Sequence, residues 1–256
     1  MGTTPDPDVA AWYAALESRH LATLTLPEVR RALQSLSALY VERRGRLAEG
    51  RALDGAGKRA AFALHYAPLH FMIVREIVRA LPLGPGPSRI VDLGCGTGAA
   101  SAAWALATGG RPRVVGIDAS GWAIAEAGWN LETLGIRATL RRGDLLDARL
   151  GDPTEGIVAA FTVNELPGEA RERLLGKLLA AASHGSRVLV VEAIARRPVP
   201  WWPAWAAAFR EAGGRDDLWR FPAALPERMR TLDRAAGLDH RELTARSLWL
   251  AAPGVR

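Results

Sequence analysis

Cysteine is almost absent from this sequence, since Cys95 is the only one in 256 residues. One cysteine cannot form a disulfide within the chain, and it cannot supply the several thiolates of a cysteine-type zinc or iron–sulfur site. The histidines show none of the short spacings typical of zinc sites; they are His20, His65, His70, His184 and His240. We therefore predict that the chain has no metal site.

Lysine is also scarce, because only Lys58 and Lys177 stand among 33 basic residues and the others are arginines. The net charge is +6, and the isoelectric point is near 10.3. This balance favours an anionic partner, such as RNA or a ribosomal partner. The alternative is an arginine-rich composition set by the base composition of the genome, because the arginines are spread along the chain.

Long apolar runs are missing too. No run comes near the ~20 residues that cross a bilayer. The first 20 residues carry Asp6, Asp8 and Glu17 and lack the apolar core of a signal peptide. With 49% hydrophobic and 23% charged residues, the composition is that of an ordinary globular protein. We expect a cytoplasmic protein that makes no membrane contact.

A segment rich in proline and glycine, residues 82–87, divides the chain because it cannot continue a helix. Before it, apolar residues recur at the spacing of one helix face: Val29, Leu33, Leu36 and Tyr40. We predict an N-terminal helical region over residues 1–82, on the lid or substrate side, and a second domain over residues 85–256.

The second domain alternates short apolar runs with helical stretches. Strands are predicted at 89–93, 113–117, 137–141, 157–163 and 187–192, and helices at 99–108, 122–134 and from 167 to about 179. Such alternation indicates parallel βαβ units with right-handed crossovers. Residues 238–251 would add an antiparallel pair at the sheet edge. The predicted fold class is α/β, Rossmann-like and mostly parallel, with helices on both faces and an N-terminal helical extension.

The first predicted strand ends in a glycine-rich turn, Asp92-x-Gly94-x-Gly96-x-Gly98, which leads directly into a helix. Glycines permit a tight turn and let a ligand lie against bare backbone, and the amides at the helix start suit a carboxylate. Asp92 would face an ammonium group. The spacing also fits a dinucleotide fingerprint, but Asp92 would repel a pyrophosphate. The turn therefore favours the amino-acid end of S-adenosylmethionine.

Two further predicted strands are followed by acidic residues. Asp118 is placed to accept hydrogen bonds from both hydroxyls of a ribose; alternatively it caps the next helix, a role that Ser120 also suits. Asp144 follows the third strand and can accept a hydrogen bond from an adenine amino group while Leu145 packs on the ring. The alternative for Asp144 is ordinary turn chemistry.

The fourth predicted strand leads into Asn164 and Glu165. Ligands of open α/β sheets lie outside the carboxyl ends of the strands, so both side chains are expected near a transferred methyl group. Either orients an acceptor, and Glu165 removes its proton where the acceptor has one to lose. The alternative for Glu165 is a cap on the helix that opens at Pro167. The tryptophans that follow the fifth strand either stack on a planar substrate or anchor a helix; they are Trp201, Trp202 and Trp205.

Together these motifs resemble those of class I S-adenosylmethionine-dependent methyltransferases: VDLGCGTG at 91–98, GID at 116–118, GDL at 143–145 and the strand end that carries Asn164. The resemblance spans about residues 85–195. It implies a seven-stranded sheet with a reversed final strand, S-adenosylmethionine as cofactor, and methyl transfer by direct displacement. The predicted catalytic residues are Asn164 and Glu165. The predicted cofactor-binding residues are Asp92, Gly94, Cys95, Gly96, Thr97, Gly98, Asp118, Ala119, Asp144, Leu145 and Thr162.

A narrower resemblance involves LSALY at 36–40, the helix that begins near Pro68, and FTVNEL at 161–166. These segments are similar to methyltransferase-like proteins of mitochondrial small-ribosomal-subunit assembly and their bacterial relatives. The resemblance favours an RNA or ribosomal acceptor, although the residues do not identify it. Two alternatives stay open. One is a non-catalytic ribosome-assembly or RNA-binding protein that retains the cofactor pocket, and the other is an NAD(P)-dependent oxidoreductase.

Overall fold

The computed structural model describes residues 7–42, 53–109, 112–194 and 199–251, which form two compact units. The first unit combines the chain up to His70 with Phe221–Leu243, and the second combines Phe71–Arg220 with the chain from Thr244. Sequence analysis placed the division at residues 82–85. Three elements run from one unit into the other: α4 (Ala67–Ala80), β6 (Arg215–Pro222) and β7 (Glu242–Leu250).

The first unit is helical. It holds α1 (Pro7–His20), α2 (Leu26–Glu42), α3 (Ala56–Ala61), the π-helical turn η2 (Phe62–Tyr66) and α9 (Glu227–Ala235). Three residues of the predicted apolar stripe face inward, because Val29, Leu33 and Leu36 of α2 are fully buried. The side chain of the fourth, Tyr40, lies outside the described part of the structure. Two contacts join the late segment to the early helices: the Gln34 side chain donates to the Ala235 carbonyl at 2.9 Å, and Arg228 pairs with Glu17 at 3.1 Å.

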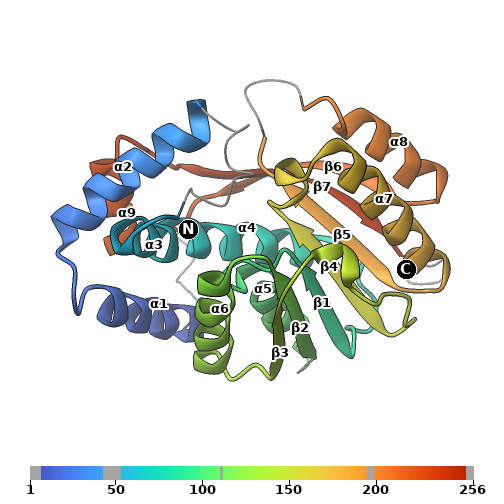
Figure 1. Cartoon of the computed structure of the whole chain (residues 1–256), viewed down its shortest axis with the longest axis horizontal. Helices are drawn as coiled ribbons and strands as arrows, with labels where there is room; N and C mark the ends of the chain where they lie inside the picture. Colours follow the sequence, from blue (N-terminus) through green and yellow to red (C-terminus); the bar gives the residue numbers. More distant parts are fainter. Residues whose placement is uncertain (1–6, 43–52, 110–111, 195–198, 252–256) are drawn as a thin grey trace. The chain divides into compact units, whose positions relative to one another are not determined.

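The second unit is built on a seven-stranded sheet in the order β3-β2-β1-β4-β5-β7-β6 (Figure 1). Its first five strands are parallel where they pair, and β7 is antiparallel to β5. Their bounds are β1 (Arg89–Leu93), β2 (Arg113–Asp118), β3 (Ala138–Arg142), β4 (Glu155–Ala160) and β5 (Arg187–Glu192). This confirms the predicted Rossmann-like, mostly parallel sheet with a reversed strand.

The antiparallel strand lies inside the sheet and not at its edge. β7 sits between β5 and β6, so β6 forms the edge. The sequence predicted that both strands of the antiparallel pair lie within residues 238–251. In the structure one of them, β6, is formed by residues 215–222. The sequence of β6 gives little sign of a strand, because its side chains alternate between exposed and partly exposed and include Arg215, Asp216 and Asp217.

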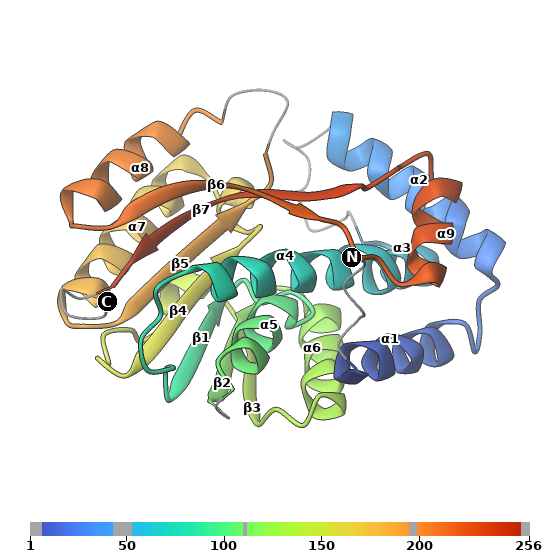
Figure 2. The same ribbon diagram turned by 180° about the vertical axis from the view of Figure 1, so that it is seen from behind.

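Helices cover both faces of this sheet, α7 (Gly168–Ser183) and α8 (Trp202–Glu211) on one and α5 (Ala99–Ala107) on the other (Figures 1 and 2). Alternate strand residues make this possible, because period-two side chains point to opposite faces. Val188 and Val190 share one core with Leu174 and Phe209. Helix α6 (Gly121–Thr133) packs against β2 and β3. Every helix among the described residues is too short or too polar to cross a membrane.

The tryptophan-rich segment belongs to the core. Trp201, Trp202 and Trp205 are at most 8% exposed. The rings of Trp201 and Trp205 pack edge to face, with 4.9 Å between their centroids. These contacts agree with the interpretation that the tryptophans anchor a helix. Residue 198, which opens the segment, lies outside the described residues.

Strand β4 ends earlier than the sequence predicts, at Ala160 and not at residue 163. The reason is local. Phe161 takes a positive φ of 57°, and residues Val163–Glu165 form a short 3-10 turn, η4. The Thr162 hydroxyl bonds to the Ala160 carbonyl at 3.1 Å, which helps to turn the chain. Asn164 and Glu165 are thereby carried beyond the strand end.

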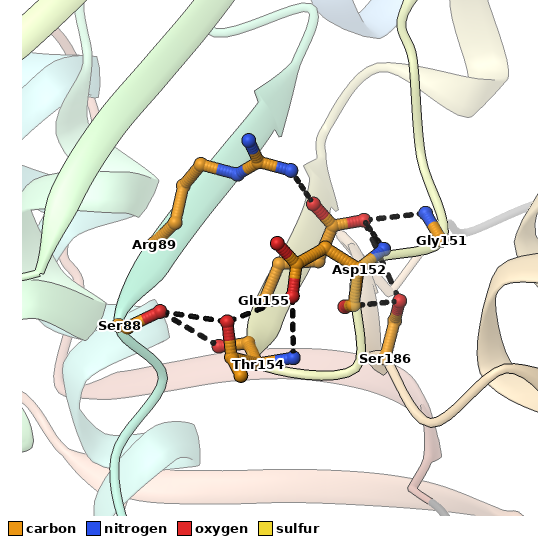
Figure 3. A network of polar contacts seen from close by, with 7 residues as sticks. All are labelled: Ser88, Arg89, Gly151, Asp152, Thr154, Glu155 and Ser186. Atoms are coloured by element: carbon orange, nitrogen blue, oxygen red, sulfur yellow. Dashed lines mark hydrogen bonds and ion pairs between the residues drawn. The ribbon is translucent and has the colours of Figure 1, made fainter.

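A polar network joins the amino ends of β1 and β4, where Arg89 pairs with Glu155 in the sheet (Figure 3). Glu155 is fully buried and forms an ion pair with Arg89. Its carboxylate also accepts from the amides of Gly151 at 2.7 Å and Asp152 at 3.3 Å, and from the Ser186 hydroxyl at 3.4 Å. The network lies at the amino ends of the strands, so it fixes the sheet and not the predicted site.

Candidate active site

The glycine-rich turn follows β1, and each of its three glycines has a positive φ. A Cβ on Gly94 would lie 2.3 Å from Cγ2 of Thr162, so the close approach of these two segments requires glycine. Gly96 differs, because no atom of the described residues lies within 4 Å of the place where its Cβ would stand. The backbone at Gly96 is therefore bare, as a ligand that lies against it requires.

Asp92 is inside the protein. It is 1% exposed, and its Oδ2 accepts from the Ser101 amide at 3.1 Å in the first turn of α5. Burial raises the pKa of Asp92 to about 6, the hydrogen bonds from Ser101 oppose this shift, and the charge of Asp118 adds to it. Asp92 thus joins the end of β1 to the start of α5. Its contact with an ammonium group stays a prediction.

Asp118 reaches the turn from β2. Its Oδ2 accepts from the Gly96 amide at 2.9 Å, and its Oδ1 accepts from the Ser120 amide at 2.7 Å. Ser120 caps α6, because its Oγ accepts from Ala123 at 3.3 Å, so Asp118 does not have that role. A carboxylate has about four acceptor positions, which leaves two for ribose hydroxyls. The neighbouring Ala119 is exposed.

Asp144 stands at the corresponding place after β3. Its Oδ1 accepts from the Leu146 amide at 2.8 Å and starts the 3-10 turn η3 (Leu145–Asp147). The turn chemistry is therefore present, while the carboxylate is exposed and keeps further acceptor positions for an adenine amino group. Leu145 is 8% exposed. The adenine contact stays a prediction.

Cys95 and Thr97 are buried, at 5% and 3% exposed, so the turn can offer their backbone groups more readily than their side chains. Burial, and then the charges of Asp92 and Asp118, raise the pKa of the Cys95 thiol well above its usual range. Asn130 of α6 donates from Nδ2 to the Thr97 carbonyl at 3.0 Å. Sequence reasoning missed Asn130, whose only signal is a buried amide in a largely apolar helix.

Asn164 is held by two residues that sequence reasoning did not connect to it. Its backbone amide donates to Oε1 of Glu192 at 3.1 Å, and its Nδ2 donates to Oε2 at 2.7 Å. Its Oδ1 accepts from Nε1 of Trp201 at 2.9 Å. Both ends of the amide are engaged, so the structure fixes Asn164 firmly. The one signal for Glu192 in the sequence is its place as an acid at the end of the apolar run of β5.

Glu192 is 2% exposed. Burial is the main cause that raises the pKa of Glu192, to about 7, and the negative charge of Glu165 adds to the rise. The hydrogen bonds from the backbone and side chain of Asn164 and the positive charge of Arg246 act in the opposite direction. The guanidinium of Arg246 lies 4.1 Å from the ring centroid of Trp202. A buried carboxylate therefore supports the loop that carries both predicted catalytic residues.

Glu165 is exposed at the end of this loop. No side chain caps α7, whose N-cap is Pro167, so the capping alternative for Glu165 is not found. Partial loss of solvent around the carboxylate, and then the negative charge of Asp118, raise the pKa of Glu165 to about 7. Glu165 therefore exchanges a proton near neutral pH and lies within electrostatic reach of the ribose-binding candidate.

The strand order and the site define a class of protein. Dinucleotide-binding Rossmann folds have the parallel order 3-2-1-4-5-6, whereas this sheet places an antiparallel strand between β5 and β6. Asp92, Asp118, Asp144 and Glu165 all lie at or just beyond the carboxyl ends of parallel strands. Together they define the class I methyltransferase fold and distinguish the chain from NAD(P)-dependent oxidoreductases.

Comparisons with known proteins agree. Residues 90–185 match the family described as "Methyltransferase domain". Mitomycin 7-O-methyltransferase has a similar structure, with a TM-score of 0.54 and 17% identity over 97% of this chain and 74% of that one. A second similar structure is an O-methyltransferase from neocarzinostatin biosynthesis in complex with S-adenosylmethionine and 2-hydroxy-5-methyl naphthoic acid. Its TM-score is 0.53, with 17% identity over 79% of this chain and 60% of that one. At this identity both show a shared fold. No curated protein sequence matches the chain.

Residues 90–185 therefore match a methyltransferase domain, and the chain has the fold of class I S-adenosylmethionine-dependent methyltransferases. The residues present fit the cofactor. The bare backbone at Gly96 leaves space for it, and Asp118 holds that backbone while keeping acceptor positions free. Asn164 and Glu165 follow the strand beside this turn, as the predicted catalytic roles require.

Proposed function

We propose that this methyltransferase acts on RNA and that Glu165 is its general base. The proposal is supported chiefly by a basic edge on the second unit, which we call the β3 edge. It consists of four exposed arginines on or next to β3 and β2: Arg113, Arg137, Arg141 and Arg142. Because β3 is the terminal strand of the sheet, no other strand in the described part of the chain covers this edge.

The β3 edge adjoins the cofactor-binding turns. Arg142 donates from Nε to the Ala119 carbonyl at 3.0 Å, beside Asp118. The guanidinium of Arg141 lies near Gly143, where a Cβ would stand 3.3 Å from Nη1. Phosphate contacts from arginines supply much of the affinity of proteins for RNA, and guanidinium groups bind phosphate in bidentate fashion. An RNA strand along this edge would lead directly to the turns that carry the predicted ribose and adenine contacts.

The catalytic part of the proposal rests on Glu165. When bound, S-adenosylmethionine supplies a methyl group on a sulfonium, which is already an excellent leaving group. The chain therefore has to align the acceptor and receive its proton. Glu165 suits the second task because its pKa of about 7 leaves a useful fraction ionised at neutral pH. Glu192 and Trp201 would help to align the acceptor, because they hold Asn164 and thereby fix the loop that carries Glu165.

A small-molecule acceptor is the second candidate. Two proteins of similar structure are O-methyltransferases, one of them in complex with a naphthoic acid. Glu165 would serve a hydroxyl acceptor in the same way. A third candidate is a non-catalytic RNA-binding protein that retains the cofactor site, and it shares the β3 edge with the main proposal.

One experiment separates the three candidates. The purified chain is incubated with S-adenosylmethionine labelled in its methyl group and with the RNA, protein and metabolite fractions of a cell extract. We expect label in RNA, and we expect the double variant R141Q/R142Q to lose most of it. The matched control, R173Q/R210Q, removes the same charge from exposed arginines on α7 and α8 and should retain activity.

The other outcomes are equally definite. Label in the metabolite fraction that R141Q/R142Q leaves unchanged would establish the small-molecule candidate. RNA binding without label would establish the non-catalytic one. For RNA binding itself, each lost phosphate contact should reduce the slope of log affinity against log salt by about 0.7 for a single strand. A slope equal in both double variants would contradict a role of the β3 edge.

A further inference from the structure

A cluster of three metal-ligating side chains lies in the first unit, apart from the cofactor turns. His65 belongs to the turn η2, Asp233 to α9, and His240 to the segment between α9 and β7. The fold brings together residues that stand 168 positions apart in the sequence. None of them takes part in the methyl transfer proposed above.

The donor atoms converge on one point. Nε2 of His65 lies 2.8 Å from Oδ1 of Asp233, and Nδ1 of His240 lies 2.7 Å from the same oxygen. The three donor atoms lie within 4.8 Å of one another. The second oxygen of Asp233 is engaged separately, because it accepts from the backbone amide of His240 at 2.8 Å. The carboxylate is thus oriented with one oxygen toward both imidazoles.

The cluster is buried on one side and accessible on the other. His65 and Asp233 are 0% and 1% exposed, whereas the His240 side chain is 32% exposed. Burial by itself would raise the pKa of Asp233, but hydrogen bonds from His240 and His65 hold that pKa well below its usual range. The partly exposed His240 gives an ion a path to the cluster.

We propose that His65, Asp233 and His240 form a binding site for a divalent transition metal, with zinc as the ion that this donor set favours. Two imidazole nitrogens and one carboxylate oxygen are typical zinc ligands, and solvent completes four-coordination at sites with three protein ligands. Zinc lies at about 2.0–2.2 Å from such atoms. In a tetrahedron the donors then stand roughly 3.3 Å apart, so the present nitrogen–oxygen separations need to open by only about 0.5 Å.

The surrounding backbone is in keeping with this site. His65 lies in a π-helical turn, Phe62–Tyr66, within a longer helical stretch. Such turns are rare and are frequently found at functional sites. The prediction of no metal site from sequence depended on short histidine spacings, and these ligands come from segments that only the fold joins.

The ion would act as a staple within the first unit. It would link the segment Phe221–Leu243 to the early helices, where Gln34 and Arg228 already make single contacts. A bound metal stabilises the folded state in proportion to its concentration relative to its dissociation constant. The proposal does not depend on RNA as the acceptor or on Glu165 as the base.

The test uses the full chain, stripped with a chelator and then titrated with Zn²⁺ by calorimetry and followed by thermal unfolding. We expect one Zn²⁺ per chain and a melting temperature that rises with Zn²⁺. Co²⁺ should give the strong visible absorption of a four-coordinate site. Cofactor binding, measured separately with S-adenosylmethionine, should be similar with and without the metal.

Two variants separate a metal site from a hydrogen-bonded cluster. His65→Gln places an amide N–H near the position of Nε2, and His240→Asn places one near that of Nδ1, so both can still donate to Asp233. We expect each to bind Zn²⁺ at least about tenfold more weakly, the loss typical even of residues that only support a ligand. The matched control is His184→Asn, an exposed position on the second unit, which should bind Zn²⁺ like the unmodified chain.

The proposal fails if the unmodified chain binds no Zn²⁺ and shows no Co²⁺ absorption, a result that needs no variant to fold. It fails equally if His240→Asn binds and is stabilised by Zn²⁺ as the unmodified chain is. In that case the three residues would form only a hydrogen-bonded link between two segments. A loss of Zn²⁺ binding in His184→Asn would then place the bound ion at that surface histidine.

Discussion

The contact between Gly94 and Thr162 gives the sharpest test of the site geometry. In Gly94→Ala the new Cβ would lie 2.3 Å from Cγ2 and 2.7 Å from Oγ1 of Thr162, at a φ of +69°. A left-handed conformation costs a residue with a Cβ roughly 1–2 kcal/mol. Overpacking of this kind costs about 1–3 kcal/mol more. We therefore expect Gly94→Ala to lower the free energy of unfolding by about 3 kcal/mol.

Two further variants separate these two costs. Thr162→Ala removes both clashing atoms and leaves only a Cβ, at 3.1 Å. Gly94→Ala should therefore cost about 1–2 kcal/mol less in the presence of Thr162→Ala, a coupling typical of residues in contact. Gly96→Ala is the matched control. Its φ is +51° and its Cβ would meet nothing within 4 Å, so it should cost only about 1 kcal/mol.

The assay is urea unfolding followed by tryptophan fluorescence, together with calorimetric titration of S-adenosylmethionine. We expect the two glycines to separate stability from affinity. Gly94→Ala should mainly lower stability, whereas Gly96→Ala should mainly weaken cofactor binding, because its methyl group occupies the bare backbone where the cofactor is predicted to lie. Equal destabilisation by the two variants, or strict additivity with Thr162→Ala, would refute the reasoning.

Three other predictions follow from the same structure. Asp118→Asn should weaken S-adenosylmethionine binding about tenfold to a hundredfold by calorimetry, because it removes a charged acceptor from the ribose site; unchanged affinity would contradict that role. The value of kcat/KM should fall about tenfold per pH unit below the pKa of Glu165, near 7, because a general base must be ionised, and Glu165→Gln should abolish this limb of the profile. A limb retained in Glu165→Gln would assign the base elsewhere. Glu155→Ala should lower the free energy of unfolding by about 3 kcal/mol, since it leaves Arg89 and two backbone amides without their shared partner, with no change in cofactor affinity.

The parallel part of the sheet could be predicted because its strands are short apolar runs between helices. β1 and β5 begin and end where the sequence places them, since both strands are largely buried and each carries a run of apolar side chains. β6 and α9 were missed for the opposite reason. β6 is an edge strand with charged side chains, and α9 has few apolar residues, of which Met229 and Leu232 are buried. The end of β4 was also misplaced, because no pattern foretells the positive φ of Phe161.

The site divides in the same way. Sequence could assign roles to Asp118 and Asp144, because each directly follows or ends a strand, and parallel strand ends meet at one edge of a sheet. It could not find Glu192 as the partner of Asn164, which is 28 residues away, or Asn130 as the support of Thr97. Neither pair has a spacing rule, because each depends on how two elements pack against each other.

The carboxylates at these strand ends are of two physical kinds, and the difference explains what sequence could not resolve. Asp92 and Glu192 are buried, and each accepts a hydrogen bond from a backbone amide of a neighbouring segment: Ser101 in α5 for Asp92, and Asn164 in η4 for Glu192. Burial raises the pKa of both toward neutrality, so each is stable only while its amide partner stays in place. Such groups hold neighbouring segments of the chain in one conformation.

Asp118 and Glu165 are the other kind. They are accessible, and Asp118 satisfies only part of its acceptor capacity within the protein. Desolvation contributes most to the raised pKa of Glu165, and the charge of Asp118 adds to it; the positive sulfonium of a bound cofactor would offset the second of these contributions. The pKa of Glu165 seen in the pH profile of kcat should then lie below the pKa seen in the profile of kcat/KM for S-adenosylmethionine. We therefore expect the two kinds of carboxylate to differ in their main tasks: the buried pair holds the chain segments in place, and the accessible pair prepares the site for the positive charge of the cofactor.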